Sequence, residues 1–336
     1  MITNHPSPGT LKSTIGEGQL LWHMALDNTW IVPDPHTLCD VRLDDETVTV
    51  LRRHGNPEGP RLVLSHGNGL AIDLYYPFWS LLIDDYDLIL YDQRNHGWNT
   101  VGDQQNHDVP TLIHDQRLIL EAIDGQFGHK PKVGVYHSVS ALITLLSIST
   151  FRDLISSGPA VDFAGLVLFD PPLCKPGISQ VEFDAAAEQV AAATRRRGHL
   201  FQTEEDFVEL LSFSPSFVRV VPGGRELMAK TTLRKTGKGD GFELRCPREF
   251  EAQIIDYSRS YSVLVDFDEL DCPTKVIGAD PTLPYSYLPT LDLRDMVTVD
   301  YDFLPETTHF FPLEQPEECV SLLREFLESK GLAHTE

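Results

Sequence analysis

The stretch KVGVYHSVSALITLLSIS, residues 132–149, decides the fold. Its first half is an apolar run that predicts a strand buried on both faces, and a helix-length apolar segment begins directly after Ser138. A strand that breaks sharply into a helix at a serine lifts the hydroxyl clear of the sheet and directs the next backbone N–H groups toward a developing oxyanion. Ser138 is therefore the candidate nucleophile.

The residues on either side of Ser138 depart from the usual turn, which is Gly-x-Ser-x-Gly. Small residues at the two glycine positions let the helix and the neighbouring strand approach the serine, and here those positions hold Tyr136 and Ser140. Ser140 is small enough, whereas Tyr136 is not. Taken alone, the motif fits a serine that merely starts a helix as well as it fits a nucleophile, so the rest of the chain has to decide.

Two other segments carry the groups that a serine nucleophile needs. RLVLSHGNGL, residues 61–70, predicts a short strand ending in HGNG, whose glycines free backbone N–H groups to point into a cavity. CPTKVIGAD, residues 272–280, ends a Val/Ile strand on Asp280, and His309 follows another strand. The order Ser138, Asp280, His309 is typical of hydrolases with a strand-turn-helix nucleophile.

Each of these groups has a predicted role. His309 would take the proton of Ser138 and later pass it to the leaving group, because imidazole titrates near neutrality. Asp280 would hold the imidazole tautomer. The oxyanion would lie between the backbone N–H groups of Asn68 and Val139.

From about Glu46 to Glu328 the chain resembles the α/β-hydrolase fold family. HGNG resembles the oxyanion loop of that family, YDQRNHGWN a strand and loop with Asp-x-Arg-x-His-Gly, HSVSA the nucleophile turn, and THFFPLEQPEE the histidine loop followed by the last helix. GDGFELRCPREFEAQI resembles a cap element found in some bacterial and peroxisomal lipase-like members. The resemblance implies a serine hydrolase with a helical cap.

The choice of the acid has an alternative. Asp170, in VLFDPP at the end of an earlier strand, occupies a position from which some members of the family supply the acid. Asp280 is preferred for its position 29 residues before His309 and for its neighbours Gly278 and Pro281. Other histidines, His66 and His96 among them, are interpreted as structural, and the absence of HxH or HExxH spacing predicts no metal.

The predicted fold class is α/β, with a mostly parallel central sheet. Residues 46–53, ETVTVLRR, alternate polar and apolar like an antiparallel strand. Short apolar runs fit strands buried on both faces; they are 62–65, 88–91, 133–136, 166–169, 275–277 and 297–299. Helical stretches at 111–123 and 316–328 alternate with them. The predicted core comprises residues 1–170 and 274–336. A helical cap, residues 171–273, is inserted after the sixth strand, since this segment is far longer than an ordinary loop.

The cap is expected to cover a substrate pocket. Candidate pocket residues are Gly69, Trp98, His137, Phe213 and Phe217. For the phenylalanines of the cap, packing within the cap is the competing interpretation. RKTGKGDG, residues 234–241, is interpreted as an exposed loop or hinge.

The composition limits the partners and the compartment. The 336 residues include 27 basic and 50 acidic side chains, for a net charge of −23, which disfavours nucleic acid and anionic membranes. The basic run Arg195-Arg196-Arg197 is interpreted as a solvated helix face. Five scattered cysteines without CxxC spacing, no signal-peptide pattern and no membrane-length apolar run predict a cytoplasmic protein. We expect a small-molecule substrate, no cofactor, and a possible homodimer.

These observations favour hydrolysis of a carboxylic ester or lactone of a medium-sized, largely apolar molecule. Two alternatives remain open. One is a carbon-carbon bond hydrolase of a 1,3-diketone-like compound, which uses the same triad. The other is a ligand-binding scaffold without activity. Tyr136 favours this alternative, because a bulky side chain behind Ser138 would distort the nucleophile turn.

Overall fold

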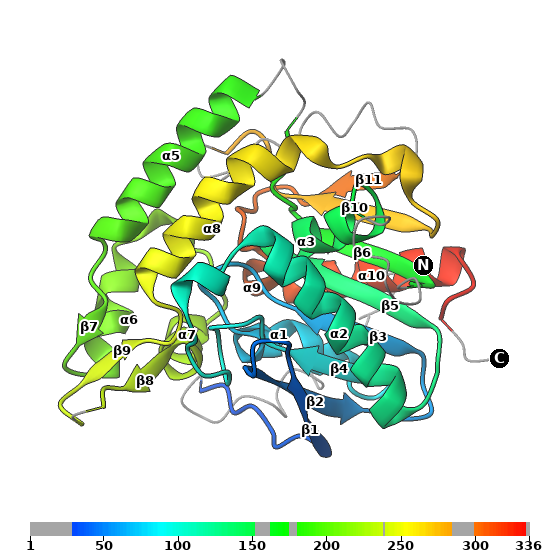
Figure 1. The fold of residues 1–336 in the computed structure, drawn as a ribbon, viewed down its shortest axis with the longest axis horizontal. Helices are drawn as coiled ribbons and strands as arrows, with labels where there is room; N and C mark the ends of the chain where they lie inside the picture. The colour runs from blue at the N-terminus through cyan, green and yellow to red at the C-terminus, as the bar shows by residue number, and fades with distance from the viewer. Residues whose placement is uncertain (1–28, 152–161, 175–179, 238, 284–298, 334–336) are drawn as a thin grey trace, which may run out of the picture.

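The computed structural model describes residues 29–151, 162–174, 180–237, 239–283 and 299–333. A sheet of eight strands runs through the centre of the molecule (Figure 1). In spatial order the strands are β1 (Thr37–Arg42), β2 (Val48–Gly55), β4 (Asp87–Tyr91), β3 (Arg61–Ser65), β5 (Lys132–His137), β6 (Gly165–Phe169), β10 (Thr274–Gly278) and β11 (Asp300–Phe303). β2 pairs antiparallel with β1 and with β4, and the other pairs are parallel. The predicted mostly parallel α/β sheet is confirmed.

Both faces of the sheet are covered by helices, which explains why its central strands are apolar throughout. α2 (Val109–Phe127) and α3 (Val139–Ile148) pack together on one face. α1 (Tyr76–Trp79), α9 (Phe311–Glu314) and α10 (Pro316–Ser329) pack together on the other. Successive residues of β3 accordingly enter different apolar clusters, Leu62 and Leu64 on the α10 side and Val63 on the α2 side.

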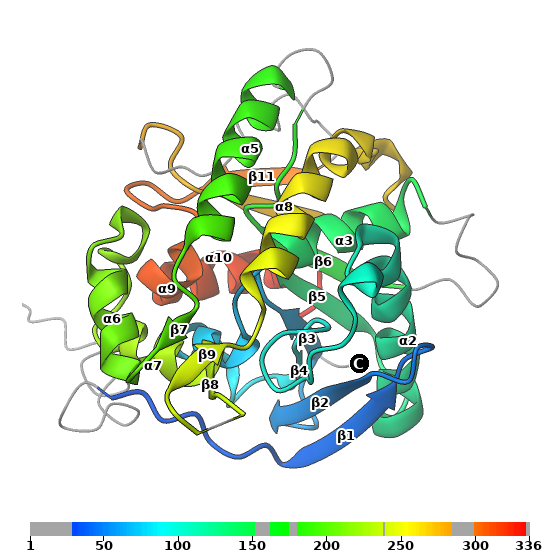
Figure 2. The same cartoon turned by 60° about the vertical axis from the view of Figure 1, so that its left-hand side comes forward.

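A cap follows the sixth strand and, as its helices α5 (Gln180–Arg196) and α8 (Arg248–Tyr261) show, lies in front of the core in Figure 2. These two longer helices pack against each other. The smaller elements are β7 (Leu200–Phe201), α6 (Glu204–Ser212), α7 (Gly224–Thr232), β8 (Leu233–Lys235) and β9 (Phe242–Leu244).

The cap differs from the prediction at residues 234–241, which were expected to form only a loop or hinge. Residues at both ends of this segment are paired, because β8 and β9 form an antiparallel hairpin that β7 extends to three strands. Arg234 lies opposite Glu243, and its Nε donates to the Glu243 carboxylate over 2.9 Å. Gly241, at a φ of 113°, supplies the turn backbone that favours glycine.

Several hydrogen bonds fasten the cap to loops of the core, among them those of Asn68, Gln253 and Arg245. The side-chain amide of Asn68 donates to the carbonyl of Glu251 over 2.8 Å. The amide of Gln253 donates to the carbonyl of His107 over 2.9 Å. Arg245, which follows β9, donates to the carbonyl of Gly97 over 2.8 Å. The cap therefore rests directly on the loops that follow β3 and β4.

Some predictions concern parts of the chain outside the described residues. These are the N-terminal segment 1–28, the segment 284–298, and the end 334–336. The strand predicted at 297–299 begins in this gap, and the last strand of the sheet lies at Asp300–Phe303. Among the described helices, none is both long and apolar enough to span a membrane. The five cysteines are free thiols.

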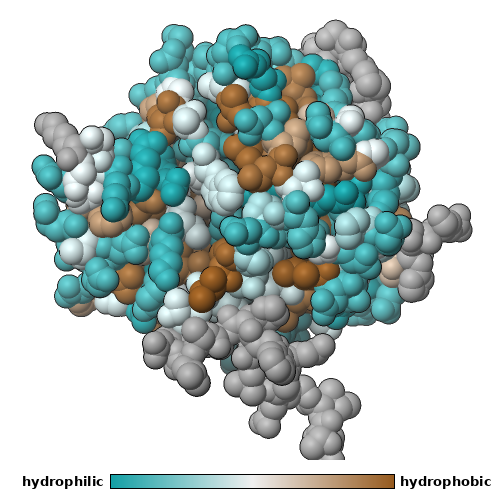
Figure 3. All heavy atoms as spheres, turned by 90° about the horizontal axis from the view of Figure 1, so that it is seen from below, coloured by the Kyte–Doolittle hydropathy of each residue, from teal (hydrophilic) through white to brown (hydrophobic). Residues whose placement is uncertain are grey.

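The surface carries apolar side chains in patches between hydrophilic residues, as one face shows (Figure 3). In the cap, Leu210, Phe213 and Val218 are exposed, and Phe213 retains 76% of its accessible surface. Single exposed apolar residues are ordinary on protein surfaces, so the exposure of these three does not by itself indicate a binding site.

Candidate active site

The turn at Ser138 has the geometry that its sequence predicts. β5 ends at His137 and α3 begins at Val139, and Ser138 between them has a φ of 56°. Non-glycine residues rarely adopt this left-handed region, and where they do the strain is often functional. The Ser138 N–H is held by the carbonyl of Phe169 over 2.8 Å, which ties the turn to β6.

Tyr136 does not crowd the turn, because its ring lies over Gly134. A Cβ at Gly134 would come within 2.5 Å of the Tyr136 ring, so the glycine that makes room stands two residues earlier on the same face of β5. The ring packs edge-on against Tyr91 and Phe163 and is fully buried. Ser140, the small residue two positions after Ser138, stabilises the turn. Its hydroxyl accepts from the N–H of His137 over 3.0 Å and donates to the His137 carbonyl over 2.9 Å.

His309 joins Ser138 to a carboxylate. Its Nε2 lies 2.9 Å from the Oγ of Ser138, and its Nδ1 lies 2.6 Å from the Oδ2 of Asp170. All three side chains are at least nine-tenths buried. Asp170 directly follows β6, the neighbour of β5, and has a φ of 40°. The structure therefore brings together Ser138 and His309 with the alternative acid.

The prediction that Asp280 pairs with His309 is wrong in this structure. Asp280 follows β10, which lies one strand further from β5 than β6 does. Its carboxylate accepts from the N–H and hydroxyl of Thr282 over 2.8 and 2.6 Å, and from the N–H of Glu306 over 2.7 Å. The Thr282 hydroxyl and the Glu306 N–H hold the pKa of Asp280 below its usual value. Asp280 thus closes a turn and holds the start of the loop that carries His309.

The oxyanion loop leaves one of three consecutive N–H groups available. The Gly67 N–H donates to the hydroxyl of Tyr75 over 3.2 Å, and the Gly69 N–H donates to Nε2 of His96 over 3.0 Å. Between them, the Asn68 N–H has no partner within the described part of the chain. Val139 is the first residue of α3, where an N–H has no partner in its own helix. Asn68 and Val139 both line the cavity at Ser138.

Two neutral histidines brace this loop, as interpreted from the sequence. Nδ1 of His66 donates to the Gly67 carbonyl over 2.8 Å, and its Nε2 accepts from the N–H of Gln93 over 3.1 Å. Nδ1 of His96 donates to the carbonyl of Arg94 over 2.8 Å. Burial lowers the pKa of His96 to about 4 and also lowers that of His66. Each ring therefore donates from one nitrogen and accepts at the other.

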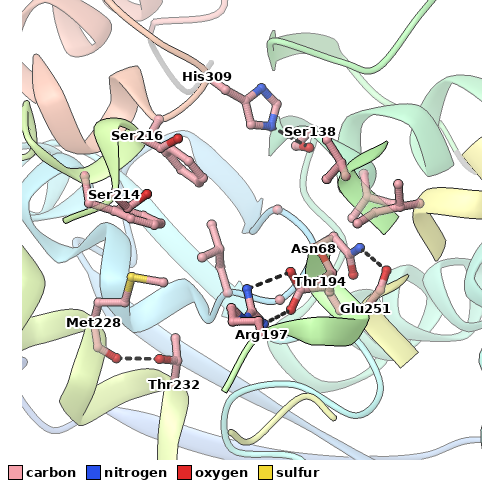
Figure 4. Close-up of a pocket in the computed structure, with 18 of the residues that line it drawn as sticks. Asn68, Ser138, Thr194, Arg197, Ser214, Ser216, Met228, Thr232, Glu251 and His309 are labelled. Carbon is pink, nitrogen blue, oxygen red and sulfur yellow. Dashed lines mark hydrogen bonds and ion pairs between the residues drawn. The ribbon is translucent and has the colours of Figure 1, made fainter. Parts of the chain in front are cut away.

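A cavity of about 440 Å³ opens above Ser138 under the cap (Figure 4). Its walls are mostly apolar, and those of the cap and histidine loop are Ala187, Val190, Phe207, Leu210, Leu211, Phe213, Phe217, Met228, Leu244, Ile254, Ile255 and Phe310. The predicted pocket residues Gly69, His137, Phe213 and Phe217 are among the lining residues. A cavity of this volume can hold a medium-sized organic molecule.

Trp98 is the one predicted pocket residue that does not line this cavity. Its indole N–H donates to the carboxylate of Asp73 over 2.8 Å, and the guanidinium of Arg52 lies 4.6 Å from its ring centroid. These two contacts hold the side chain within a polar cluster beside the cavity.

An ion pair from the cap lies over the HGNG loop, and no sequence pattern predicted it. Arg197 donates to both carboxylate oxygens of Glu251, with the longer bond at 3.2 Å (Figure 4). A Cβ at Gly69 would come within 2.5 Å of that carboxylate, so a side chain here would displace it. The interpretation of Arg195-Arg196-Arg197 as a solvated face is corrected at Arg197. Arg195 agrees with it, pairing with Asp256 where both side chains are exposed.

Within the described ranges, His, Cys, Asp and Glu side chains form no group that could hold a metal ion.

Comparisons with known proteins identify the family and the fold of the chain. Residues 62–322 match the profile of a family described as the alpha/beta hydrolase family. No curated protein matches the chain. Among solved structures, E-2-(acetamidomethylene)succinate hydrolase is similar, with 16% identity, a TM-score of 0.69, and coverage of 87% of this chain and 99% of that one.

Two further solved structures are similar over comparable lengths. The thioesterase domain from the curacin biosynthetic pathway has 15% identity and a TM-score of 0.63, and the match covers 86% of this chain and 99% of the domain. A thermophilic esterase from Thermogutta terrifontis has 19% identity and a TM-score of 0.60, with coverage of 89% and 100%. At such identities these likenesses concern the fold.

Proposed function

Because the chain belongs to the alpha/beta hydrolase family, we propose that it is a serine hydrolase that cleaves a carboxylic ester or lactone through an acyl-enzyme on Ser138. The observation that carries the proposal is the hydrogen-bonded series from Asp170 through His309 to Ser138 beneath an apolar cavity. The members of such a series are recognised by geometry and role rather than by position in the chain.

Each residue has a defined part in the proposed reaction. Nε2 of His309 accepts the hydroxyl proton while Oγ of Ser138 attacks the carbonyl carbon, and the same nitrogen then protonates the leaving alcohol. Asp170 fixes the tautomer with hydrogen on Nδ1 and stabilises the imidazolium. Water, activated by His309, releases the acid and restores Ser138.

The N–H groups of Asn68 and Val139 are proposed to bind the oxyanion. A fixed donor of this kind contributes roughly 3 to 4 kcal/mol to transition-state stabilisation where it has been measured. Neither donor needs to reorient, because the neighbouring N–H groups of Gly67 and Gly69 are already bonded and hold the loop in place.

The mostly apolar walls of the cavity favour a substrate whose acyl or alcohol group is largely apolar. Phe207, Phe213, Phe217 and Phe310 provide aromatic surface in the cavity. Among its described lining residues, the histidines of the site aside, the charged side chains are Arg197 and Glu251, which pair with each other. An ester that bears a charge would lose its hydration on entering the cavity and find no partner for the charge there, so its binding would be disfavoured.

The test is the intact mass of the protein after incubation with a fluorophosphonate, together with turnover of p-nitrophenyl acetate and octanoate. We expect one adduct in the wild type, none in Ser138→Ala, and one in Ser212→Ala, which changes an exposed serine of the cap. Octanoate should have the higher kcat/KM. Absence of the wild-type adduct would refute the acyl-enzyme and favour a binding scaffold. An adduct with turnover of a vinylogous 1,3-diketone but of no ester would favour carbon-carbon cleavage.

A further inference from the structure

A second buried histidine connects the two halves of the site. His137 precedes Ser138, and its Nε2 lies 2.8 Å from the backbone carbonyl of His309. Its Nδ1 lies 2.6 Å from the hydroxyl of Tyr75, and that hydroxyl accepts from the N–H of Gly67 over 3.2 Å. A continuous series of hydrogen bonds thus runs from the oxyanion loop, past the nucleophile, to the loop that carries His309.

The chemistry of the partners fixes the direction of every bond in this series. A carbonyl oxygen can only accept, so Nε2 of His137 carries the hydrogen that it gives to His309. In the neutral ring Nδ1 is then an acceptor, and the hydroxyl of Tyr75 donates to it. The Tyr75 oxygen is left to accept from Gly67. The neutral ring with its hydrogen on Nε2 therefore satisfies the His309 carbonyl, the His137 ring, the Tyr75 hydroxyl and the Gly67 N–H at once. The other tautomer and the protonated ring each leave at least one of these groups without a suitable partner.

Close packing makes the connection stiff. A Cβ at Gly67 would lie 2.8 Å from Nδ1 of His137 and 3.2 Å from the Cβ of Ser138, so the loop backbone lies directly against both side chains. The ring of His137 lies 4.7 Å from that of His309, centroid to centroid, and both are buried. A shift of the His137 ring would therefore move the Asn68 N–H, the nucleophile or the base relative to the others.

We propose that His137 is a positioning residue, which fixes the backbone of His309 and the oxyanion loop in one geometry around Ser138. This inference rests on the proposed function for its consequence in catalysis, although the arrangement itself does not. Displacement of reacting groups by about 1 Å can cost on the order of 100-fold in rate, and His137 touches the loops that carry both the base and one oxyanion donor.

A neutral ring is also what the neighbouring base requires. His309 becomes an imidazolium when it takes the Ser138 proton, and a second positive ring beside it would oppose that step. Burial and the neighbouring His309 hold the pKa of His137 well below its ordinary value. His137 can therefore lie against His309 without competing for the proton.

Two substitutions separate the two bonds of His137. In His137→Gln the amide nitrogen reaches the place of Nε2 and retains the donor to His309. In His137→Asn the amide oxygen takes the place of Nδ1 and retains only the acceptor for Tyr75. Tyr75→Phe removes the other end of the series and keeps the aromatic volume. Activities are divided by the fraction of protein that a fluorophosphonate labels, which corrects for unfolded material.

We expect kcat for p-nitrophenyl octanoate to fall less than about threefold in His137→Gln, about tenfold in Tyr75→Phe, and about 30-fold or more in His137→Asn, with KM changing less than threefold in each. The low-field proton NMR signal of the bond between His309 Nδ1 and Asp170 should persist in His137→Gln and be lost or shifted in His137→Asn. Equal kcat and equal signals in the two His137 variants would overturn the proposal.

The NMR signal separates failure of this inference from failure of the proposed function. A wild type that neither reacts with the fluorophosphonate nor hydrolyses esters, but shows the expected signal pattern in its variants, refutes the proposed function and supports the positioning role. A wild type that does both, with His137 variants indistinguishable from each other, refutes the positioning role alone.

Discussion

Asp170 and Asp280 both end a parallel strand, and they differ in what their carboxylates bind. Asp170→Asn should reduce kcat by about 10⁴, because an amide cannot hold the Nδ1–H tautomer of His309 and stabilise its charge. Asp280→Asn should keep kcat within about threefold, since the Asp280 carboxylate accepts from Thr282 and Glu306 rather than from His309. Its loss of charged hydrogen bonds should lower the free energy of unfolding by about 1–2 kcal/mol. Ester turnover and urea unfolding of the two variants measure both effects, and a larger loss of kcat in Asp280→Asn would reverse the assignment.

The sequence contained a sign of this difference. Asp280-Pro281-Thr282 is an Asp-x-Thr sequence, in which the aspartate caps a turn by accepting from the residue two positions later. Asp170 is followed by two prolines, which have no N–H for it to accept. Spacing along the chain cannot rank the two acids, because it does not reveal which strand lies next to β5. HGNG and His309 could be located from local pattern, whereas the turn at Ser138 pointed to a nucleophile only in combination with those two segments.

Tyr136 and Gly134 act as a pair. Gly134→Ala should destabilise the protein by about 1–3 kcal/mol, because its Cβ would come within 2.5 Å of the Tyr136 ring and 2.7 Å of Leu166. In a Tyr136→Ala background the cost of the same change should be smaller, since the contact with the Tyr136 ring is gone and those with Leu166 and Phe163 remain. A double-mutant cycle by urea unfolding measures the difference. Additive effects would show that the ring and the glycine are independent.

At the scale of elements, the cap is held over the oxyanion loop by the ion pair of Arg197 and Glu251. Arg197→Met should raise KM about three- to tenfold and destabilise the protein by about 1–2 kcal/mol, because it leaves the Glu251 carboxylate, 11% exposed, against Gly69 without its guanidinium. Arg195→Met is the matched control two residues earlier, near the end of α5, where the pair with Asp256 is exposed and a change below about 1 kcal/mol is expected. Equal KM values for the two variants would contradict the role given to Arg197.

The elements of the core were more predictable than those of the cap. Parallel strands that are buried on both faces need apolar runs, and such runs can be recognised directly in a sequence. The strands β3, β5 and β6 are examples. The hairpin of β8 and β9 is short and bears Arg234 and Glu243, so its pairing depends on a cross-strand contact rather than on an apolar pattern. The contact of Arg197, which directly follows α5, likewise depends on where α8 lies, and the sequence around Arg197 does not encode that position.

For the whole molecule, buried histidines make stability depend on pH. Burial lowers the pKa to about 4 in His54 and in His96, and to about 3 in His107. The unfolded chain binds a proton on each ring near pH 6.5, whereas the folded protein does so only near these lower values. The contribution of these rings to the free energy of unfolding should therefore be fully present above pH 6.5. It should fall as the pH drops toward 4, by on the order of 1 kcal/mol per pH unit for each ring.

Urea unfolding at several values between pH 7 and pH 5 tests this dependence. His54→Phe keeps a ring against Trp79 but removes one titrating group, so its stability should fall less steeply with pH than that of the wild type. Parallel curves for the two proteins would exclude His54 as a contributor.

The cap divides the chain between the members of the site. Ser138 and Asp170 precede it, and His309 follows it. A chain cut in the turn between β8 and β9 would give two fragments, one with the proposed nucleophile and acid and the other with the proposed base. Neither fragment alone could generate an activated serine, so ester turnover would appear only when the two reassemble. Fused to a pair of interacting proteins, the halves would form a split-enzyme reporter whose signal is amplified by turnover.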